Sequence, residues 1–374
     1  MMEWIIDVLK WYLVLCGIGI LGFPIVFGFL KKLPGRGFVF SRSLGMILIT
    51  FLFWLGGTLG FLRNDIGGLV CAVLFVAGLS LAVWLRERDA IREWLAGSRK
   101  YCIVSEIIFL LAFLLIVFFR LGGPEVSGTE KPMEMMFINS ILKSETFPPQ
   151  DAWLSGYSIS YYYFGYIMSA VLIMLSDVIS SVGFNLMLAF VFAMAAVSAF
   201  GIINDLLNLR KDADTAFPVL RLRSLLAPLF VLITGNLEGL FEVLHSLHLF
   251  WNADGTSGFW NWLGLKELTE FPSRAASWDL TGRSGIWWWR ASRVVGDTGL
   301  QGSVKEVIDE FPMFSFELGD LHPHVIAIPF VLFAVGIALN ALFLNLERSE
   351  RGPFFMEGLI AGIPLKETAM GCML

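Results

Sequence analysis

The sequence predicts an all-α integral membrane protein, a polytopic helix bundle with about seven to eight spans and one juxtamembrane or re-entrant helix. Three observations lead to this prediction. The 374 residues are 56% hydrophobic and only 16% charged, with a mean hydropathy of +0.72. Several apolar runs reach the roughly 20 residues that a spanning helix needs. Basic residues gather in alternate connections between these runs, as the positive-inside rule requires.

The first four apolar runs cover about 8–30, 43–62, 66–85 and 103–120. Basic residues follow the first run (Lys31, Lys32, Arg36, Arg42) and the third (Arg86, Arg88, Arg92, Arg99, Lys100). The positive-inside rule therefore places both connections in the cytoplasm. The N-terminus and an external segment that follows the fourth span then face outward.

The run at 161–176 is the exception to simple crossing. If it and 183–204 both crossed, the basic loop that follows would lie outside, against the positive-inside rule. That loop contains Arg210, Lys211, Arg221 and Arg223. The shorter run is therefore expected to stay at one face, covered by protein. The runs 183–204, 223–240 and 325–344 then cross in turn.

The chain is expected to have three parts. Residues 1–102 supply N-terminal membrane helices, and 103–344 form a core membrane module with external loops 121–160 and 241–324. Residues 345–374 are a poor spanning helix and are expected to be an atypical, truncated tail. We therefore expect a multi-pass protein of the cell membrane that interacts with the lipid bilayer.

The sequence argues against nucleic-acid binding and against a framework of disulfide bonds. The net charge of −5 comes with no basic run of the kind that binds nucleic acid. The four cysteines form no CxxC pair, so a disulfide framework is not expected. The sequence gives no prediction of oligomeric state.

Ionisable residues are enriched in the segment 309–324, directly before the last apolar run. Four acids and two of the four histidines of the chain lie there. Pro323 suits the first turn of a helix, so Asp320 and His322 should lie at a helix entrance that favours phosphate. Asp320, His322 and His324 are also ligand types for a divalent metal such as Mg or Mn. The alternative is that Asp320 caps the helix and the histidines are interfacial.

The first external loop supplies candidate general bases. Glu125, Glu130 and Asp151 are carboxylates in this loop, and Asp320 completes the catalytic candidates. Tyr161, Tyr162 and Tyr163 follow the loop. Their rings suit stacking on sugars or bonding to a headgroup, although an interfacial aromatic belt is the alternative role.

The second external segment supplies candidate phosphate ligands. Arg290 and Arg293 directly follow three tryptophans, and guanidinium groups match phosphate oxygens. A tryptophan belt at the interface is the alternative. Asn236 interrupts an apolar run and is expected to line the same cavity. The full set of substrate-binding candidates is Lys131, Tyr161, Tyr162, Tyr163, Asn236, Trp289, Arg290, Arg293, Glu310, His322 and His324.

Several motifs in order resemble those of the YYY-motif membrane proteins, a family of uncharacterised polytopic proteins. They are Pro124-Glu125 with Gly128–Met133, Pro148-Pro149 with Asp151 and Trp153, Tyr161–Tyr166, Gly235–Leu237, Trp288–Arg293, and Glu310–Pro312 through Gly319–His324. The resemblance covers roughly 1–350. That family is more distantly similar to type C membrane glycosyltransferases, which use polyprenyl-phosphate sugars. The similarity implies that Glu125 stands where those enzymes keep an essential external acid.

These observations favour a glycosyltransferase-like membrane protein that acts at the outer face on a polyprenyl-phosphate-linked sugar. A lipid-linked phosphate is then its substrate. The alternatives are a transporter or flippase of a lipid-linked substrate and a non-catalytic membrane assembly subunit. A transporter usually places polar groups near the bilayer midplane, whereas these charges gather at one boundary.

Overall fold

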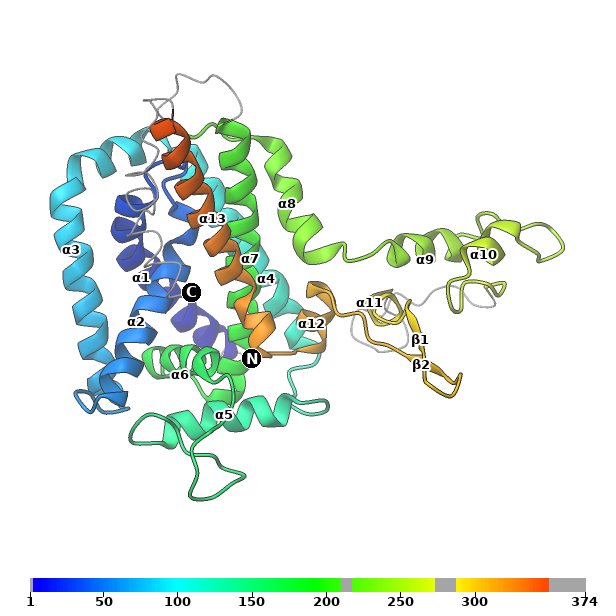
Figure 1. Cartoon of the computed structure of the whole chain (residues 1–374), viewed down its shortest axis with the longest axis horizontal. Helices are drawn as coiled ribbons and strands as arrows, with labels where there is room; N and C mark the ends of the chain where they lie inside the picture. The colour runs from blue at the N-terminus through cyan, green and yellow to red at the C-terminus, as the bar shows by residue number, and fades with distance from the viewer. Residues whose placement is uncertain (1–2, 210–216, 273–286, 350–374) are drawn as a thin grey trace.

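Long apolar helices run between two ends of the molecule and form a bundle, as Figure 1 shows for this computed structural model. The structure describes residues 3–209, 217–272 and 287–349. Within these ranges, six helices are long and apolar enough to cross a membrane. They are α1 (Glu3–Phe29), α2 (Ser41–Thr58), α3 (Ile66–Gly97), α4 (Arg99–Leu121), α7 (Ser180–Leu209) and α13 (Pro323–Ser349). The predicted all-α membrane fold is confirmed.

Helix α7 is the centre of the bundle. Its side chains are mostly apolar and mostly buried, and Phe184, Phe190 and Phe200 are fully buried. A helix that is hydrophobic on all sides belongs in a core. Helices α1, α4, α6 and α13 pack around it, so the elements that carry the polar ends are held in fixed positions.

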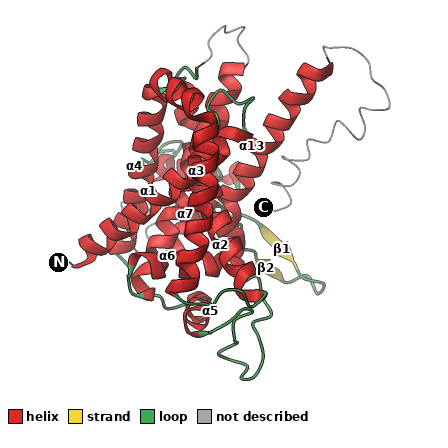
Figure 2. Cartoon of the chain, turned by 90° about the vertical axis from the view of Figure 1, so that its left-hand side faces the viewer, coloured by secondary structure: helices red, strands yellow, loops and turns green. Residues whose placement is uncertain are grey.

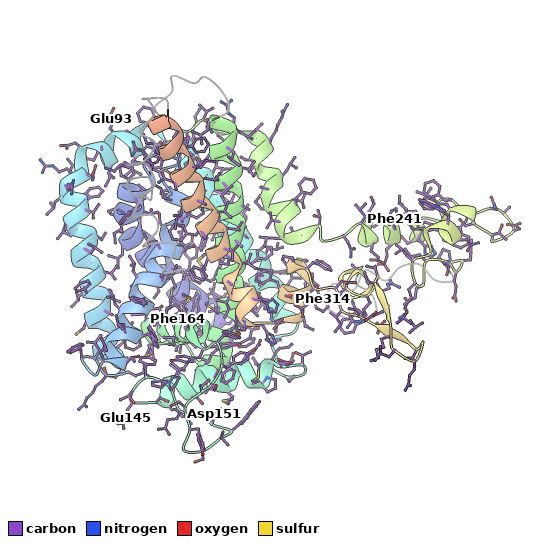
Figure 3. All side chains as sticks on the ribbon, in the orientation of Figure 1. Glu93, Glu145, Asp151, Phe164, Phe241 and Phe314 are labelled. Carbon is purple, nitrogen blue, oxygen red and sulfur yellow. The ribbon has the colours of Figure 1, made fainter. Side chains whose placement is uncertain are left out.

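The basic connections meet at one end of the bundle. Figure 3 places Glu93 at this end and Glu145 at the other. The indole of Trp94 donates a hydrogen bond to the Pro34 carbonyl at 3.1 Å, which joins the first basic loop to the end of α3. The Arg221 amide donates to Asn204 at 2.9 Å near the end of α7. This arrangement agrees with the positive-inside reading, although Arg210 and Lys211 lie outside the described residues.

The short helix at the opposite end does not cross. Helix α6 (Phe164–Ser176) has 13 residues, a length of about 20 Å, whereas the hydrocarbon core is about 30 Å thick. It lies at the same end as α5 (Lys131–Lys143), as Figures 1 and 2 show. This length agrees with the expectation that the run at 161–176 stays at one face.

The predicted span at 223–240 is interrupted by a sharp bend. Its parts are η2 (Leu222–Leu225), α8 (Leu226–Pro228), a π-helical turn η3 (Leu229–Ile233) and α9 (Glu238–Ser246). The axis turns by 89° between Ile233 and Glu238. Gly235 has a φ of +48° and lies against the Phe311 ring, so the turn is built around a glycine. Counting this pair as one span gives seven spans in the described residues, the lower limit of the prediction.

A lateral arm extends from the side of the bundle after this turn (Figure 1). It contains α9, α10 (Gly258–Leu263), α11 (Trp287–Ala291) and the antiparallel hairpin β1 (Gly296–Thr298) and β2 (Val304–Glu306). Helix α12 (Pro312–Leu318) follows the arm and packs against the bundle, where the Phe316 ring contacts Phe192 of α7. Trp260 is fully buried in the arm, and its indole donates to the Leu249 carbonyl at 2.9 Å. The arm therefore has a small aromatic core of its own. The tail at 350–374 lies outside the described residues.

Candidate functional site

Acidic and imidazole side chains meet where α5 runs beside the entrance of α13. Glu130 precedes α5, and Glu134 lies in its first turn. Asp320 and His322 lie between α12 and α13. These four residues are called the acid–imidazole cluster below. Pro323 begins α13, as the sequence predicts.

A glycine and an arginine shape the turn that presents Asp320. Gly319 has a φ of +77°, in the left-handed region that disfavours residues with a Cβ. A Cβ there would also lie 2.7 Å from Nη1 of Arg120. Arg120 donates from Nε to Asn185 at 2.7 Å and from Nη1 to the Glu317 carbonyl at 3.4 Å. The turn is thus fixed to α4 and α7.

His322 is the hub of the cluster. Its Nε2 lies 2.7 Å from Glu130 Oε2, and its Nδ1 lies 2.8 Å from Glu134 Oε1 and also contacts Asp320 Oδ1. The Leu321 amide donates to the other Glu134 oxygen at 3.2 Å. Glu134 is 0% exposed and Asp320 is 7% exposed, whereas the Glu130 side chain is 63% exposed. One carboxylate of the cluster is therefore open to a substrate.

The cluster retains protons near neutral pH. Burial, followed by the charge of Asp320, raises the pKa of Glu134 to about 8. Burial alone lowers the pKa of His322, but its hydrogen bonds to Asp320 and Glu130, together with the charges of Asp320 and Glu134, raise it to about 9. A protonated imidazole among carboxylates then supplies local positive charge.

We expect the metal-free protein to lose stability as the pH rises from about 4.5 to 9, first through Glu134 and then also through His322. His322 has a raised folded pKa, so its contribution is complete below the unfolded value of 6.5 and is lost through about 9. Glu134 acts with the same sign, because the folded state keeps a proton that the unfolded chain releases near 4.5. Each such proton contributes at most about 1.4 kcal/mol per pH unit.

Thermal unfolding in detergent with a chelator, measured across this pH range, checks the expectation. The double variant Glu134→Gln/His322→Ala should show a flatter profile. His324→Ala is the control and should keep the profile of the parent protein. An unchanged profile in the double variant would contradict this assignment of protons.

Glu125 lies beside the cluster rather than in it. Its carboxylate is close enough to act electrostatically on Arg120. Arg120 in turn contacts the backbone at Glu317 and Gly319. Sequence reasoning did not select Arg120, although a lone arginine at the end of an apolar run is a signal for such a role. The external acid and the cluster are therefore linked through one buried guanidinium.

An apolar groove opens next to the cluster. It has a volume of 500 Å³ and is walled by α2, α6 and α13. Tyr161, Tyr162, Tyr163 and Pro323 also line it. The Tyr163 hydroxyl accepts a hydrogen bond from the Trp54 indole at 3.3 Å. Because Pro323 directly follows His322, the groove and the cluster share a boundary.

The tyrosines of this boundary differ in exposure. Tyr161 stacks on Phe137 with ring centroids 5.2 Å apart, and it interacts electrostatically with Glu130, Glu134 and Asp320. Tyr162 is 77% exposed. Tyr161 is therefore the tyrosine of the run that connects the groove to the cluster.

Asp151 has a local structural partner. Its Oδ1 accepts hydrogen bonds from the amides of Trp153 at 2.8 Å and Leu154 at 3.0 Å. Figure 3 shows it on the loop beyond α5. The structure places it in its own turn, and no contact of Asp151 with the cluster is found in the described residues. Lys131 is the first residue of α5, directly after Glu130.

The arginine candidates lie in the lateral arm. Arg290 pairs with Glu242 and with Glu267, the latter at 3.3 Å. The Arg293 guanidinium lies 3.5 Å from the centre of the Trp289 ring. Among the described residues, no ion pair or hydrogen bond connects either arginine with His322 or Asp320. In the described residues, the predicted phosphate ligands and the acid–imidazole cluster therefore have separate sets of partners.

The arm has its own small cavity. Its volume is 290 Å³, and its lining comprises Glu238, Lys266, Glu267, Trp289, Arg290, Arg293, Val294 and Glu306. Asn236 donates from Nδ2 to the Ala291 carbonyl at 2.7 Å, which ties the bend before α9 to α11. Asn236 thus has a structural contact in the arm, away from the groove.

Comparison with known proteins identifies the family. Residues 48–366 match a family model described as Uncharacterized membrane protein (DUF2298). The chain belongs to this family. No curated protein and no solved structure matches. The expected likeness to type C glycosyltransferases therefore remains a prediction, while the membrane family and the helical fold are established.

The part of this DUF2298 chain that the structure describes contains two groups able to hold a metal ion. Glu134, Asp320 and His322 form one, and Glu310, Asp320 and His324 form the other, with ligand atoms within 4.8 Å in each. His324 Nε2 lies 2.9 Å from Glu310 Oε2. The sequence-based set of Asp320, His322 and His324 is thus divided between two groups.

Glu134 is the member that sequence reasoning missed. It stands four residues after Glu130, where Lys131-Pro132 begins a helix, so the two acids lie on one helical face. That spacing was an available signal. The side of the helix that turns inward depends on packing against residues near 320, which are far away in the sequence.

Proposed function

We propose that this protein is a glycosyltransferase-like membrane enzyme that acts at the outer face on a polyprenyl-phosphate-linked sugar. The observation that supports it best is the position of the acid–imidazole cluster at the boundary of an apolar groove. Catalytic groups and a lipid-binding surface are then adjacent. The outer face follows from the basic connections at the opposite end.

The groove suits the lipid part of such a substrate. Its walls come from α2, α6 and α13, which include membrane-spanning helices, and most of the side chains that line it are apolar. A polyprenyl chain in the groove places its phosphate at the level of Tyr161 and Pro323. In the metal-free protein, the protonated imidazole of His322 and the entrance of α13 are then near the phosphate, and both favour an anion.

Glu130 is the proposed general base. It is the exposed carboxylate of the cluster, and it already accepts a hydrogen bond from the His322 imidazole. The carboxylate takes the proton of an acceptor hydroxyl while the hydroxyl oxygen bonds to the anomeric carbon. The bond between that carbon and the phosphate oxygen breaks, and its electron pair leaves on polyprenyl phosphate. Glu125 is the alternative base.

Transfer by the purified protein in liposomes tests the proposal. The probes are polyprenyl-phosphate mannose and polyprenyl-phosphate glucose with labelled sugars, supplied with a membrane extract as the source of acceptors. We expect Glu130→Gln to lower the rate of sugar transfer at least about 100-fold, which is typical for loss of a general base. Asp151→Asn is the matched control in the same loop and should stay within about twofold, because its partners are local.

Other outcomes favour the other functions. If the intact labelled lipid moves across the bilayer and keeps its sugar, the protein is a flippase and the enzyme proposal is rejected. Neither transfer nor movement with either probe would contradict the proposal for these substrates. A full loss in Glu125→Gln with normal rates in Glu130→Gln would move the base to Glu125.

A further inference from the structure

We propose that Glu134, Asp320 and His322 bind a divalent metal ion through His322 Nδ1 and one oxygen of each carboxylate. The three ligand atoms lie within 4.8 Å of one another. His322 Nδ1 is 2.8 Å from Glu134 Oε1 and also contacts Asp320 Oδ1. The role of the metal rests on the proposed function, but its binding does not.

The surroundings orient the imidazole for this task. Glu130 Oε2 lies 2.7 Å from Nε2 of His322. A proton held on Nε2 by that carboxylate leaves the Nδ1 lone pair free for a metal. A carboxylate that accepts from the outer nitrogen of a ligating histidine is the usual second partner at metal sites. Glu130 therefore supports the ligand set without belonging to it.

The backbone orients Glu134 in the same way. The Leu321 amide donates to Oε2 at 3.2 Å, which leaves Oε1 directed toward His322 and Asp320. Glu134 is fully buried, and in the described part of the chain Oε1 accepts no hydrogen bond of regular geometry, although His322 Nδ1 lies 2.8 Å away. A buried carboxylate oxygen without such a hydrogen bond is unusual, and a cation is a suitable ligand for it.

A second buried polar group, the Tyr166 hydroxyl, also supports a metal ion at Glu134. The Tyr166 hydroxyl is fully buried, and among the described residues it has no hydrogen-bond partner. Glu134 and Asp320 are among the groups that act on it electrostatically. Water bound to a metal at Glu134 would give this hydroxyl a partner. One bound ion would thus contact the buried Glu134 oxygen directly and the Tyr166 hydroxyl through a water.

The other group of possible ligands is less suited. Glu310 and His324 have side chains that are 47% and 58% exposed, and they pair with each other at 2.9 Å. Glu134 and Asp320 are buried instead, where a dication offsets their negative charge. We therefore assign the ion to the buried group.

The ligand chemistry indicates the type of ion. Two carboxylate oxygens and one imidazole suit Mn²⁺ or Mg²⁺, which keep further positions for water or phosphate oxygen. Tyr161 and Pro323 line the groove beside the cluster, so a phosphate held there would be available to such an ion. When bound, the ion would neutralise charge on the phosphate of a lipid-linked substrate.

Titration of Mn²⁺ followed by electron paramagnetic resonance tests the site directly. The protein is stripped with a chelator and placed in nanodiscs of phosphatidylcholine, which has no net charge. We expect about one bound Mn²⁺ per chain, displaced by excess Mg²⁺. Glu134→Gln and His322→Ala should each raise the Kd at least about tenfold, because even outer-shell changes have effects of that size.

Matched variants come from the exposed group. Glu310→Gln and His324→Ala carry the same substitutions and should keep the Kd within about twofold. If these two variants lose Mn²⁺ while Glu134→Gln and His322→Ala retain it, the exposed group is the site and the assignment is overturned. Failure of the parent protein to bind Mn²⁺ overturns it as well, in favour of a metal-free imidazolium network.

Further measurements distinguish loss of metal binding from misfolding of a variant and from failure of the proposed function. A symmetric elution profile and a cooperative unfolding transition with chelator present identify Glu134→Gln and His322→Ala proteins that are fit for titration, and either one suffices. Bound Mn²⁺ without sugar transfer would reject the proposed function and keep the metal site. Sugar transfer at the full rate in chelator, with no Mn²⁺ bound, would reject the metal site and keep the proposed function.

Discussion

A valine at Gly22 or Gly45 is expected to prevent the chain from reaching its folded state. A Cβ at Gly22 would lie 2.0 Å from the Ser41 carbonyl oxygen, and one at Gly45 would lie 2.5 Å from the Ile18 carbonyl oxygen. Both obstacles are backbone atoms, so no side-chain rotation relieves them. Small residues allow membrane helices to approach this closely.

The consequence reaches the groove. Helix α2 packs on α1 through these glycines and supplies Ile47, Phe51 and Trp54 to the groove wall. Separation of the two helices by the width of a valine side chain would remove that wall. We therefore expect little monodisperse protein after extraction, as measured by size-exclusion chromatography and by thermal unfolding of any soluble fraction.

Gly17→Val is the matched control on α1. Nothing lies within 4 Å of a Cβ at this position, so the same substitution meets open space. The Gly17→Val protein should elute like the parent protein. If the Gly22→Val and Gly45→Val proteins also did so, the close approach of α1 and α2 would be wrong.

The membrane helices could be predicted because their length is set by the bilayer. Runs of roughly 20 apolar residues have few alternatives to a spanning helix. The topology of the short run at 161–176 could be predicted from charge, because a crossing there would have placed the following basic loop on the outer side of the membrane. Pro323 marked the start of α13, because its fixed φ suits the first turn.

The bend before α9 could not be predicted from apolar character. Leu229–Ile233 is as apolar as a spanning helix, and Pro228 and Gly235 were the local signals of an interruption. The turn depends on the contact between Gly235 and Phe311, which are far apart in the sequence. Such a tertiary contact overrides the hydropathy pattern.

The candidate site was predictable only where its members are neighbours in sequence. Asp320 and His322 share one turn, whereas Glu134 joins them across 187 residues through the Leu321 amide. Arg290 was expected to bind phosphate because of its chemistry. Its pairing with Glu267, 23 residues away, depends on how the arm folds. Residue type indicates what a side chain can bind, and folding decides which partner is near.

Loss of Glu106 alone is expected to destabilise the protein by about 3–5 kcal/mol, the usual effect of leaving one buried charge without its partner. Arg42 is 8% exposed in the first turn of α2. Its Nη1 and Nη2 donate to the two Glu106 oxygens at 3.0 and 2.5 Å. The guanidinium also lies 3.9 Å from the centre of the Phe109 ring. An unpaired cation among membrane helices has a high energetic cost.

Thermal unfolding of Glu106→Ala and of the double variant Arg42→Leu/Glu106→Leu decides between two roles for this pair. The single variant should lower Tm by roughly 6 °C or more, whereas two apolar side chains in place of the pair should be nearly neutral or stabilising. A double variant as unstable as the single one would mean that Arg42 stabilises α2 without Glu106. The stacking on Phe109 would then be the interaction that holds α2 against α4, and the ion pair would be secondary.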